Sequence, residues 1–139
     1  MADNIKLIIF DLDGVLVEAK NIHYEALNKA LGKEYSIEWN EHLSTYDGLK
    51  TNQKLEILTK DKHLPIEKYS IIWNKKQKYT LQALKNLKPN LKLKTTIDKL
   101  SKEGYKIACC SNSIRKTVLT VLSKLDLIEY MDLILSNED

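Results

Sequence analysis

Cysteine and long apolar runs are scarce in this chain of 139 residues, and each scarcity excludes a class of protein. The two cysteines, Cys109 and Cys110, are adjacent, so in a strand their side chains point to opposite faces and a disulfide between them is not expected. We therefore expect the reducing environment of the cytoplasm. No apolar run approaches the roughly 20 residues of a membrane span. We expect no secretory signal in residues 1–10, because an acid precedes their short apolar stretch.

Arginine is also nearly absent: Arg115 is the single arginine, and lysine supplies the rest of the 22 basic residues. These lysines are scattered among 19 acids, and the net charge is only +3. Nucleic-acid-binding domains instead concentrate basic residues in one patch or stripe. A hydrophobic content of 43% and a charged content of 29% are typical of a soluble globular protein. We therefore expect neither a nucleic-acid partner nor a membrane partner.

Three short apolar runs, at residues 5–10, 105–110 and 131–135, have the composition of strands that are buried on both faces of a parallel sheet. Between the second and third runs, apolar residues recur at helical spacing over residues 114–125. A strand, a helix and a second strand with short connections predict an α/β layered core.

More than ninety residues separate the first two predicted strands, whereas a parallel crossover needs only about a dozen. The surplus is helical in pattern, with one helix ending at Gly32, another capped by Ser36, and a long one that has Pro65 at its first position and runs to about Leu87. The predicted helices span residues 21–32, 36–44, 51–62, 65–87 and 91–104. We therefore predict a helical insertion over 17–87, set into a discontinuous core made of 1–16 and 88–139.

Two acids, Asp11 and Asp13, directly follow the first predicted strand and are separated by a single leucine. In parallel α/β sheets, ligands bind beyond the carboxyl ends of the strands, and Gly14 allows the backbone to turn sharply there. Paired carboxylates suit Mg²⁺, which takes oxygen ligands and keeps waters and substrate phosphate. A carboxylate can also attack phosphorus while its neighbour exchanges protons. The alternative is that both acids merely cap a turn.

Ser111, Asn112 and Ser113 follow the second predicted strand and precede a predicted helix. A hydroxyl and backbone amides at such a position can hold a phosphate group. The alternative is that Ser111 or Ser113 is an N-cap of that helix. For Ser113 this is at least as good an interpretation, whereas Ser111, immediately beyond the strand, is the better ligand candidate.

The stretch FDLDGVL at residues 10–16, followed much later by IACCSNS at 107–113, resembles the haloacid dehalogenase-like superfamily, in particular its phosphatase and phosphomutase branch with a helical C1-type cap. The resemblance implies a Rossmann-like core of three layers with a parallel sheet. It also implies that Asp11 is the nucleophile, that Asp13 is the general acid/base, and that both bind Mg²⁺, Asp13 through its backbone carbonyl. Ser111 and the Asn112 backbone would hold the transferring phosphoryl group.

Two further residues are candidate substrate contacts. His23 lies where relatives often have a cap histidine near the active site, although a lone histidine in a helix is more often structural. Arg115 follows the phosphate loop and could attract an anionic substrate or lie solvated on the surface. The loop at 45–51 resembles the cap loop that reaches the substrate in such enzymes, whereas Gly48 is equally explained as a turn glycine.

The expected function is that of a Mg²⁺-dependent phosphatase acting on a small phosphorylated metabolite, of the phosphoglycolate-phosphatase kind. A β-phosphoglucomutase-like phosphomutase is the nearest alternative, and a non-catalytic fragment or binding module is an alternative of another class. Family members use a later lysine and a later acidic pair, and this sequence stops where those motifs should begin. We therefore expect an N-terminal part of such an enzyme, with an open sheet edge beside the first strand and little activity of its own.

Overall fold

The chain divides into two compact units in the computed structural model, which describes residues 4–139. One unit, here the core unit, joins the segment up to Glu18 with Leu84–Asp139, and the other, the helical unit, is Ala19–Ala83. The predicted insertion, 17–87, therefore extends a few residues beyond the helical unit at each end. Two expectations, the absence of a secretory signal and the start of the core at residue 1, fall partly on residues 1–3, which lie outside the described residues.

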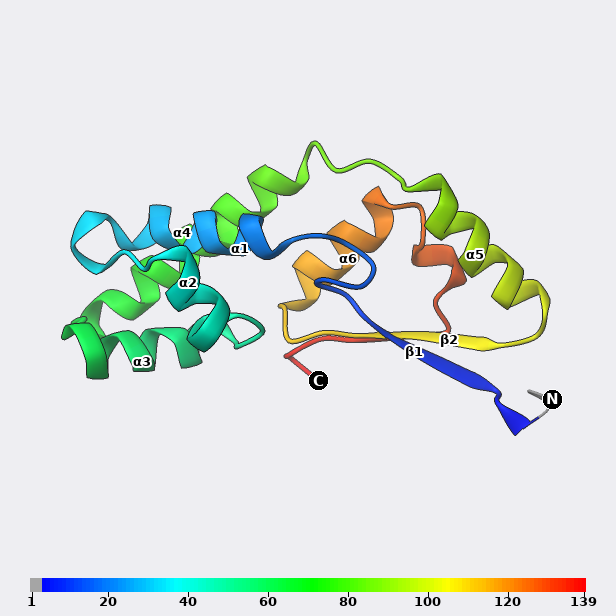
Figure 1. Cartoon of the computed structure of the whole chain (residues 1–139), viewed down its shortest axis with the longest axis horizontal. Helices are drawn as coiled ribbons and strands as arrows, with labels where there is room; N and C mark the ends of the chain where they lie inside the picture. Colours follow the sequence, from blue (N-terminus) through cyan, green and yellow to red (C-terminus); the bar gives the residue numbers. More distant parts are fainter. Residues whose placement is uncertain (1–3) are drawn as a thin grey trace. The chain divides into compact units, whose positions relative to one another are not determined.

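The core unit contains a three-stranded parallel sheet (Figure 1). Its strands are β1 (Leu7–Asp11), β2 (Lys106–Cys110) and β3 (Leu133–Leu135), in the order β1-β2-β3. Leu7 pairs with Lys106 and Asp11 with Cys110, so the carboxyl ends of β1 and β2 lie side by side. The prediction of an α/β core with a parallel sheet is confirmed.

Helices α5 (Leu91–Lys102) and α6 (Arg115–Lys124) lie on the same side of this sheet (Figure 1). When consecutive parallel strands are added in the same direction across a sheet, right-handed crossovers place the connecting helices on one face of that sheet. Val118, Val121 and Leu122 of α6 are buried, and so are Ile107 and Cys109 of β2. Burial of these side chains provides the main stabilisation of the core unit.

The expectation that the first strand is buried on both faces is wrong. Leu7 is 49% exposed and Ile9 is 59% exposed, whereas the alternate residues Ile8 and Phe10 are partly buried. Side chains alternate between the faces of a strand, and the helices pack on the other side from Leu7 and Ile9. Among the described residues β1 is also an edge strand, as expected, so it presents an unpaired edge and an apolar face together.

The helical unit consists of short helices around an apolar core. Leu27, Tyr46, Leu55 and Leu58 are 0% exposed in this core. Its elements are α1 (Lys20–Leu31), η2 (Lys33–Tyr35), α2 (Trp39–Glu41), η3 (His42–Tyr46), α3 (Thr51–Lys62), η4 (Ile66–Lys68) and α4 (Tyr69–Leu84), of which η2 and η4 are 3₁₀ turns and η3 is a π-helical turn.

Several predicted helix boundaries in this region are confirmed, and others are wrong. Gly32 ends α1 with φ of 80°, a value that glycine adopts without strain. Ser36 is not a cap: its hydroxyl donates to the carbonyl of Lys33, and α2 begins after Glu38, whose N–H donates to the Glu41 carboxylate. Pro65 precedes a 3₁₀ turn rather than opening the long helix, since α4 spans Tyr69–Leu84.

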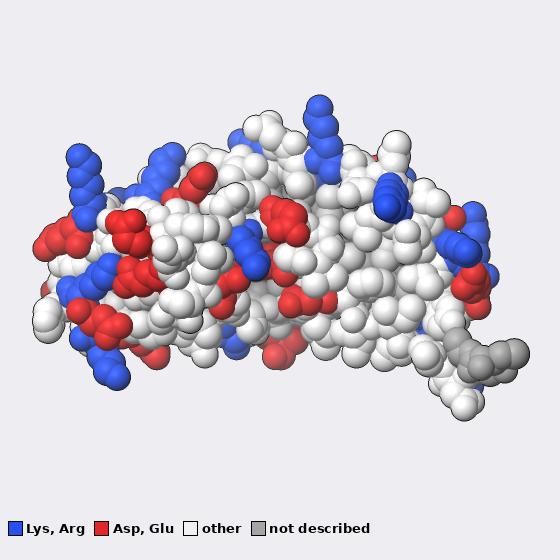
Figure 2. Space-filling view, viewed as in Figure 1, with Lys and Arg blue, Asp and Glu red and all other residues white. Residues whose placement is uncertain are grey.

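The charged side chains at the surface are of both signs. Figure 2 shows lysine and arginine side chains interspersed with acidic ones on the visible face of the molecule. Among the residues that the structure describes, no helix combines the length and the apolar character needed to span a bilayer.

Candidate active site

The loop after β1 presents Asp11 and Asp13 at the carboxyl end of the sheet. Leu12 between them is 0% exposed, and its carbonyl accepts hydrogen bonds from the amides of Leu16 (2.9 Å) and Val17 (3.1 Å). Asp11 is exposed and its Oδ1 accepts from the Leu12 amide at 2.7 Å, whereas Asp13 is half-buried. The buried Leu12 thus fixes the loop, and the two carboxylates flank it in the sequence.

Gly14 completes this turn with φ of 79°, in the left-handed region that favours glycine. Its amide donates to the carbonyl of Val17 at 2.7 Å and closes the loop. In the DLDG pattern, Leu12 is therefore required by its burial and Gly14 by its backbone conformation. Neither Asp11 nor Asp13 is needed for packing.

The loop after β2 lies beside the loop after β1, because Asp11 pairs with Cys110. The Ser111 amide donates to the Leu135 carbonyl (3.0 Å), and its Oγ accepts from the amide of Ser113 (3.1 Å). The hydroxyl of Ser113 in turn donates to Oδ2 of Asp13 at 3.3 Å. The fold thus brings Asp11, Asp13 and the serine loop to one edge of the sheet.

Neither serine is an N-cap of the following helix, so that alternative is wrong. Helix α6 starts at Arg115 after Ile114, whose side chain accepts no hydrogen bond. The first amide of the helix instead donates to the carboxylate of Glu138 at 2.7 Å. The role of Ser113 was missed: its contact with Asp13 joins residues 100 positions apart in the sequence, and no local pattern indicates it.

Arg115 forms an ion pair with Asp139. Hydrogen bonds from the backbone and side chain of Ser136, and the Arg115 guanidinium, hold the pKa of Asp139 below its usual range against the opposing effect of burial. The guanidinium charge of Arg115 is therefore compensated within the core unit. On the other side of the loop, the exposed Asn112 has its carbonyl hydrogen-bonded to the Asn137 side chain at 3.0 Å.

The neighbouring thiol of Cys109 is not a nucleophile at this edge. Burial raises the pKa of Cys109 to about 12, and Cys110, Asp11 and Asp13 add to the rise. Cys109 is 0% exposed, and a protonated, buried thiol is inert. Cys109 therefore takes no part in the chemistry of the site.

The donor set fits a magnesium ion. Among the described residues no group of three or more His, Cys, Asp or Glu side chains is arranged to hold a metal by itself. Mg²⁺ in phosphate-handling sites typically takes one or two carboxylates and completes its shell with waters and substrate phosphate. Asp11 and Asp13 are such a pair of hard oxygen donors.

The helical unit contains a second polar cluster, which was only partly anticipated. His23 lies in α1, with its Nδ1 3.2 Å from Nζ of Lys76. Lys76 is 5% exposed and Lys54 is 4% exposed. Buried lysines are rare, and the neighbouring sequence does not mark these two, since Lys76 lies between Lys75 and Gln77.

His42 also belongs to this cluster and is 0% exposed. It stacks on Trp39, with ring centroids 5.4 Å apart and an interplanar angle of 25°. Burial lowers the pKa of His42 below its ordinary value of 6.5, and Lys54 lowers it further, while Asp47 opposes the shift. The imidazole is therefore held neutral inside the helical unit. The adjacent predicted substrate loop contains Gly48 with φ of 79° and leads into α3 at Thr51.

A parallel α/β core with paired aspartates after its first strand, a hydroxyl loop after its second and a helical insertion between them defines a class of phosphate-handling hydrolases. A family model described as haloacid dehalogenase-like hydrolase matches residues 8–139. The chain therefore belongs to the haloacid dehalogenase-like hydrolase family, as the sequence resemblance indicated.

A phosphoglycolate phosphatase from Aquifex aeolicus (strain VF5) is 30% identical over 135 residues, which are 96% of this chain and 61% of the relative. A solved structure of a predicted phosphoglycolate phosphatase from Haemophilus somnus 129PT has a TM-score of 0.81 at 22% identity, over 99% of this chain and 65% of that one. The β-phosphoglucomutase of Clostridium difficile has a TM-score of 0.78 at 22% identity, over 94% and 60%. The chain thus spans less than two thirds of the length of these relatives, and the two structures show the similarity of fold.

Proposed function

We propose that this protein is a Mg²⁺-dependent phosphatase that hydrolyses a small phosphorylated metabolite through an aspartyl-phosphate on Asp11. The observation that carries the proposal is the convergence of Asp11, Asp13 and Ser111 at the carboxyl end of β1 and β2, with Ser113 linking the two loops. Ligands of parallel α/β sheets bind at this edge.

Asp11 is suited to the nucleophilic role. It is exposed, and the hydrogen bond from the Leu12 amide to its Oδ1 fixes the carboxylate and leaves Oδ2 to attack phosphorus. In the first step an oxygen–phosphorus bond forms to Asp11 and the ester bond to the leaving alkoxide breaks. Asp13 donates a proton to that alkoxide and then accepts one from the water that attacks phosphorus, which releases phosphate and restores the Asp11 carboxylate.

The remaining roles concern charge and position. A bound Mg²⁺, held by the Asp11 carboxylate and by the backbone carbonyl of Asp13, would neutralise negative charge on the phosphoryl oxygens. The Ser111 Oγ accepts a hydrogen bond from the Ser113 amide, and its own proton can be donated to a phosphoryl oxygen. The Asn112 backbone would supply a further donor.

The substrate class is proposed from the relative that is 30% identical, a phosphoglycolate phosphatase. Phosphoglycolate carries a carboxylate beside its phosphate. We retain His23 as a proposed substrate contact on the family resemblance alone. Arg115 is retained as a weaker candidate, because an anionic substrate would have to compete with Asp139. With two free cysteines, the proposed location is the cytoplasm.

The test is phosphate release by a chimera that joins this chain to the C-terminal segment of the Aquifex aeolicus phosphatase lying beyond the matched region. We expect Mg²⁺-dependent hydrolysis of phosphoglycolate, lost on addition of EDTA. Asp11→Asn keeps the side-chain shape but removes the attacking oxygen, so it should abolish turnover. Turnover that survives Asp11→Asn would refute the nucleophile, and conversion of β-glucose 1-phosphate to glucose 6-phosphate without net phosphate release would identify a phosphomutase instead.

A further inference from the structure

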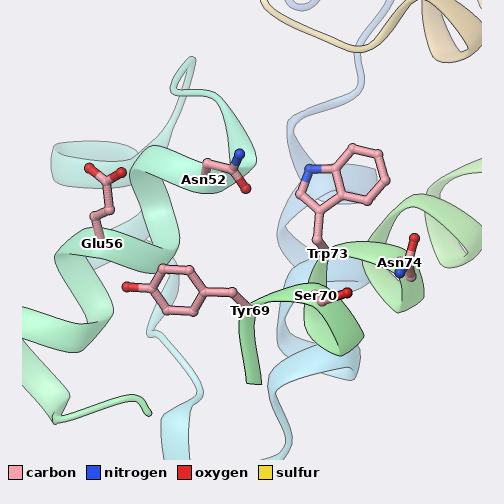
Figure 3. A pocket seen from close by; sticks show the side chains of 6 residues that line it. All are labelled: Asn52, Glu56, Tyr69, Ser70, Trp73 and Asn74. Atoms are coloured by element: carbon pink, nitrogen blue, oxygen red, sulfur yellow. The ribbon is translucent and has the colours of Figure 1, made fainter. Parts of the chain in front are cut away.

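A groove of about 530 Å³ lies between α3 and α4 in the helical unit. Helix α3 contributes side chains one turn apart, and α4 contributes two pairs of adjacent residues that are also one turn apart. The lining residues are Asn52, Glu56, Tyr69, Ser70, Trp73 and Asn74 (Figure 3). A volume of this size is within the range of small-molecule sites.

The groove has two aromatic walls. Figure 3 shows the ring of Tyr69 in the space between the helices, and the side chains of Asn52 and Trp73 on either side of that space. The Tyr69 hydroxyl donates to the Leu55 carbonyl at 3.0 Å and also contacts the Thr59 hydroxyl, so the ring is fixed before any ligand arrives. A fixed aromatic surface loses little conformational freedom on binding.

The polar lining is almost entirely neutral. Asn52, Ser70 and Asn74 provide amide and hydroxyl groups that can both donate and accept hydrogen bonds. Glu56 is the one charged residue among the six that line the groove. With no cation among those six, the groove disfavours phosphate and other anions.

A second groove of the helical unit provides a comparison. Tyr79 also lines a groove, next to Ile22 and Ala26. There the Lys29 ammonium lies over the ring of Tyr79, 4.4 Å from its centroid, so the aromatic face is already occupied. The groove between α3 and α4 instead combines aromatic walls with neutral hydrogen-bonding groups.

We propose that the groove between α3 and α4 binds an uncharged mono- or disaccharide. A pyranose has an apolar face of C–H groups that can pack on Trp73 and Tyr69, and a rim of hydroxyls that amides and a carboxylate can hydrogen-bond. Asn52 and Asn74 reach that rim from the two helices, and Glu56 accepts from a hydroxyl. The site is independent of the proposed phosphatase chemistry, because none of its residues belongs to that machinery.

The experiment is a ¹H–¹⁵N NMR titration of the 139-residue chain with glucose, maltose and N-acetylglucosamine in turn. We expect at least one sugar to give saturable shifts of the Trp73 indole N–H and the Asn52 side-chain amide, with a Kd on the order of 1 mM or tighter. The indole of Trp39, which packs edge-on against Tyr24 at 5.0 Å, is the internal reference and should not shift.

Variants separate this site from general effects on the fold. Trp73→Leu keeps an apolar side chain but removes the ring, and it should weaken binding about tenfold. The exposed Asn52→Ala should weaken it about fivefold through a lost hydrogen bond and serves if Trp73→Leu does not fold. Tyr79→Leu, in the second groove, is the matched control and should bind normally.

Three results would overturn the proposal. One is the absence of saturable shifts with all three sugars. Another is shifts that Asn52→Ala and Trp73→Leu leave unchanged. The third is a response of the same signals to choline chloride alone, which would assign the two rings and Glu56 to an ammonium ligand.

Discussion

Tyr46 is a buried tyrosine whose hydroxyl is unsatisfied, and replacing it by phenylalanine should make the protein more stable. The residue is 0% exposed, and its hydroxyl has no hydrogen-bond partner among the described residues. A buried polar group without a partner costs about 1–3 kcal/mol. Tyr46→Phe removes that cost while it keeps the ring, so we expect the free energy of unfolding to rise by at least about 1 kcal/mol.

The matched control is Tyr69→Phe in the same unit. The Tyr69 hydroxyl contacts the Leu55 carbonyl and the Thr59 hydroxyl, and each such bond contributes about 0.5–1.5 kcal/mol net. The phenol has one proton to donate, so this variant should lose about 0.5–1.5 kcal/mol. Two substitutions of the same chemistry should therefore shift stability in opposite directions.

Urea denaturation followed by circular dichroism measures both variants. With an m-value of about 2 kcal/mol/M, the midpoint should rise by about 0.5 M for Tyr46→Phe and fall for Tyr69→Phe, without a change in m. Burial also raises the pKa of Tyr46 to about 12, with Glu41 and Asp61 adding to the rise. Phenolate absorbance up to about pH 11 should therefore be the same in wild type and Tyr46→Phe. A loss of stability in Tyr46→Phe as large as that in Tyr69→Phe would show that the Tyr46 hydroxyl has a partner, such as a buried water, and would refute the reasoning.

The remaining predictions concern pH, catalysis, metal and assembly. Because burial and Lys54 lower the pKa of His42, the unfolded chain binds more protons below about pH 6.5, so the free energy of unfolding should fall as the pH drops. His42→Gln should flatten this fall in urea denaturation at about pH 5 and pH 7.5, and an unchanged slope would contradict it. In the chimera, Asp13→Asn should reduce phosphate release by about 10²–10⁴-fold. A loss of activity below tenfold would contradict the proposed role of Asp13 in proton transfer. The 139-residue chain alone should release little phosphate, and it should bind Mg²⁺ only weakly in calorimetry, because Asp11 and Asp13 supply few ligands. Turnover at ordinary enzyme rates would show that its own residues complete the site. The edge and apolar face of β1 should make the chain self-associate, and Ile9→Lys should reduce the mass in sedimentation; a wild-type monomer would contradict this.

Local patterns determined much of the fold. Apolar runs of strand length, the helical spacing over α6 and the glycine that ends α1 are features of neighbouring residues, so they could be interpreted without a structure. The same holds for the loop after β1. The position of Asp11 and Asp13 directly after a predicted strand indicated a site there, and the family resemblance of DLDG added their proposed chemistry. The parallel sheet was predicted from apolar runs joined through a segment of helical spacing.

Other features depend on contacts between distant segments, and only the tertiary structure decided them. Ser113 reaches Asp13 across 100 positions, and Arg115 finds its counter-charge at Asp139; neither partner can be chosen from local sequence, because any of many acids or hydroxyls could have been brought near. The exposure of Ile9 on β1 has the same origin. An apolar residue in a strand indicates only that burial would be favourable, whereas actual burial depends on whether another layer packs against that face.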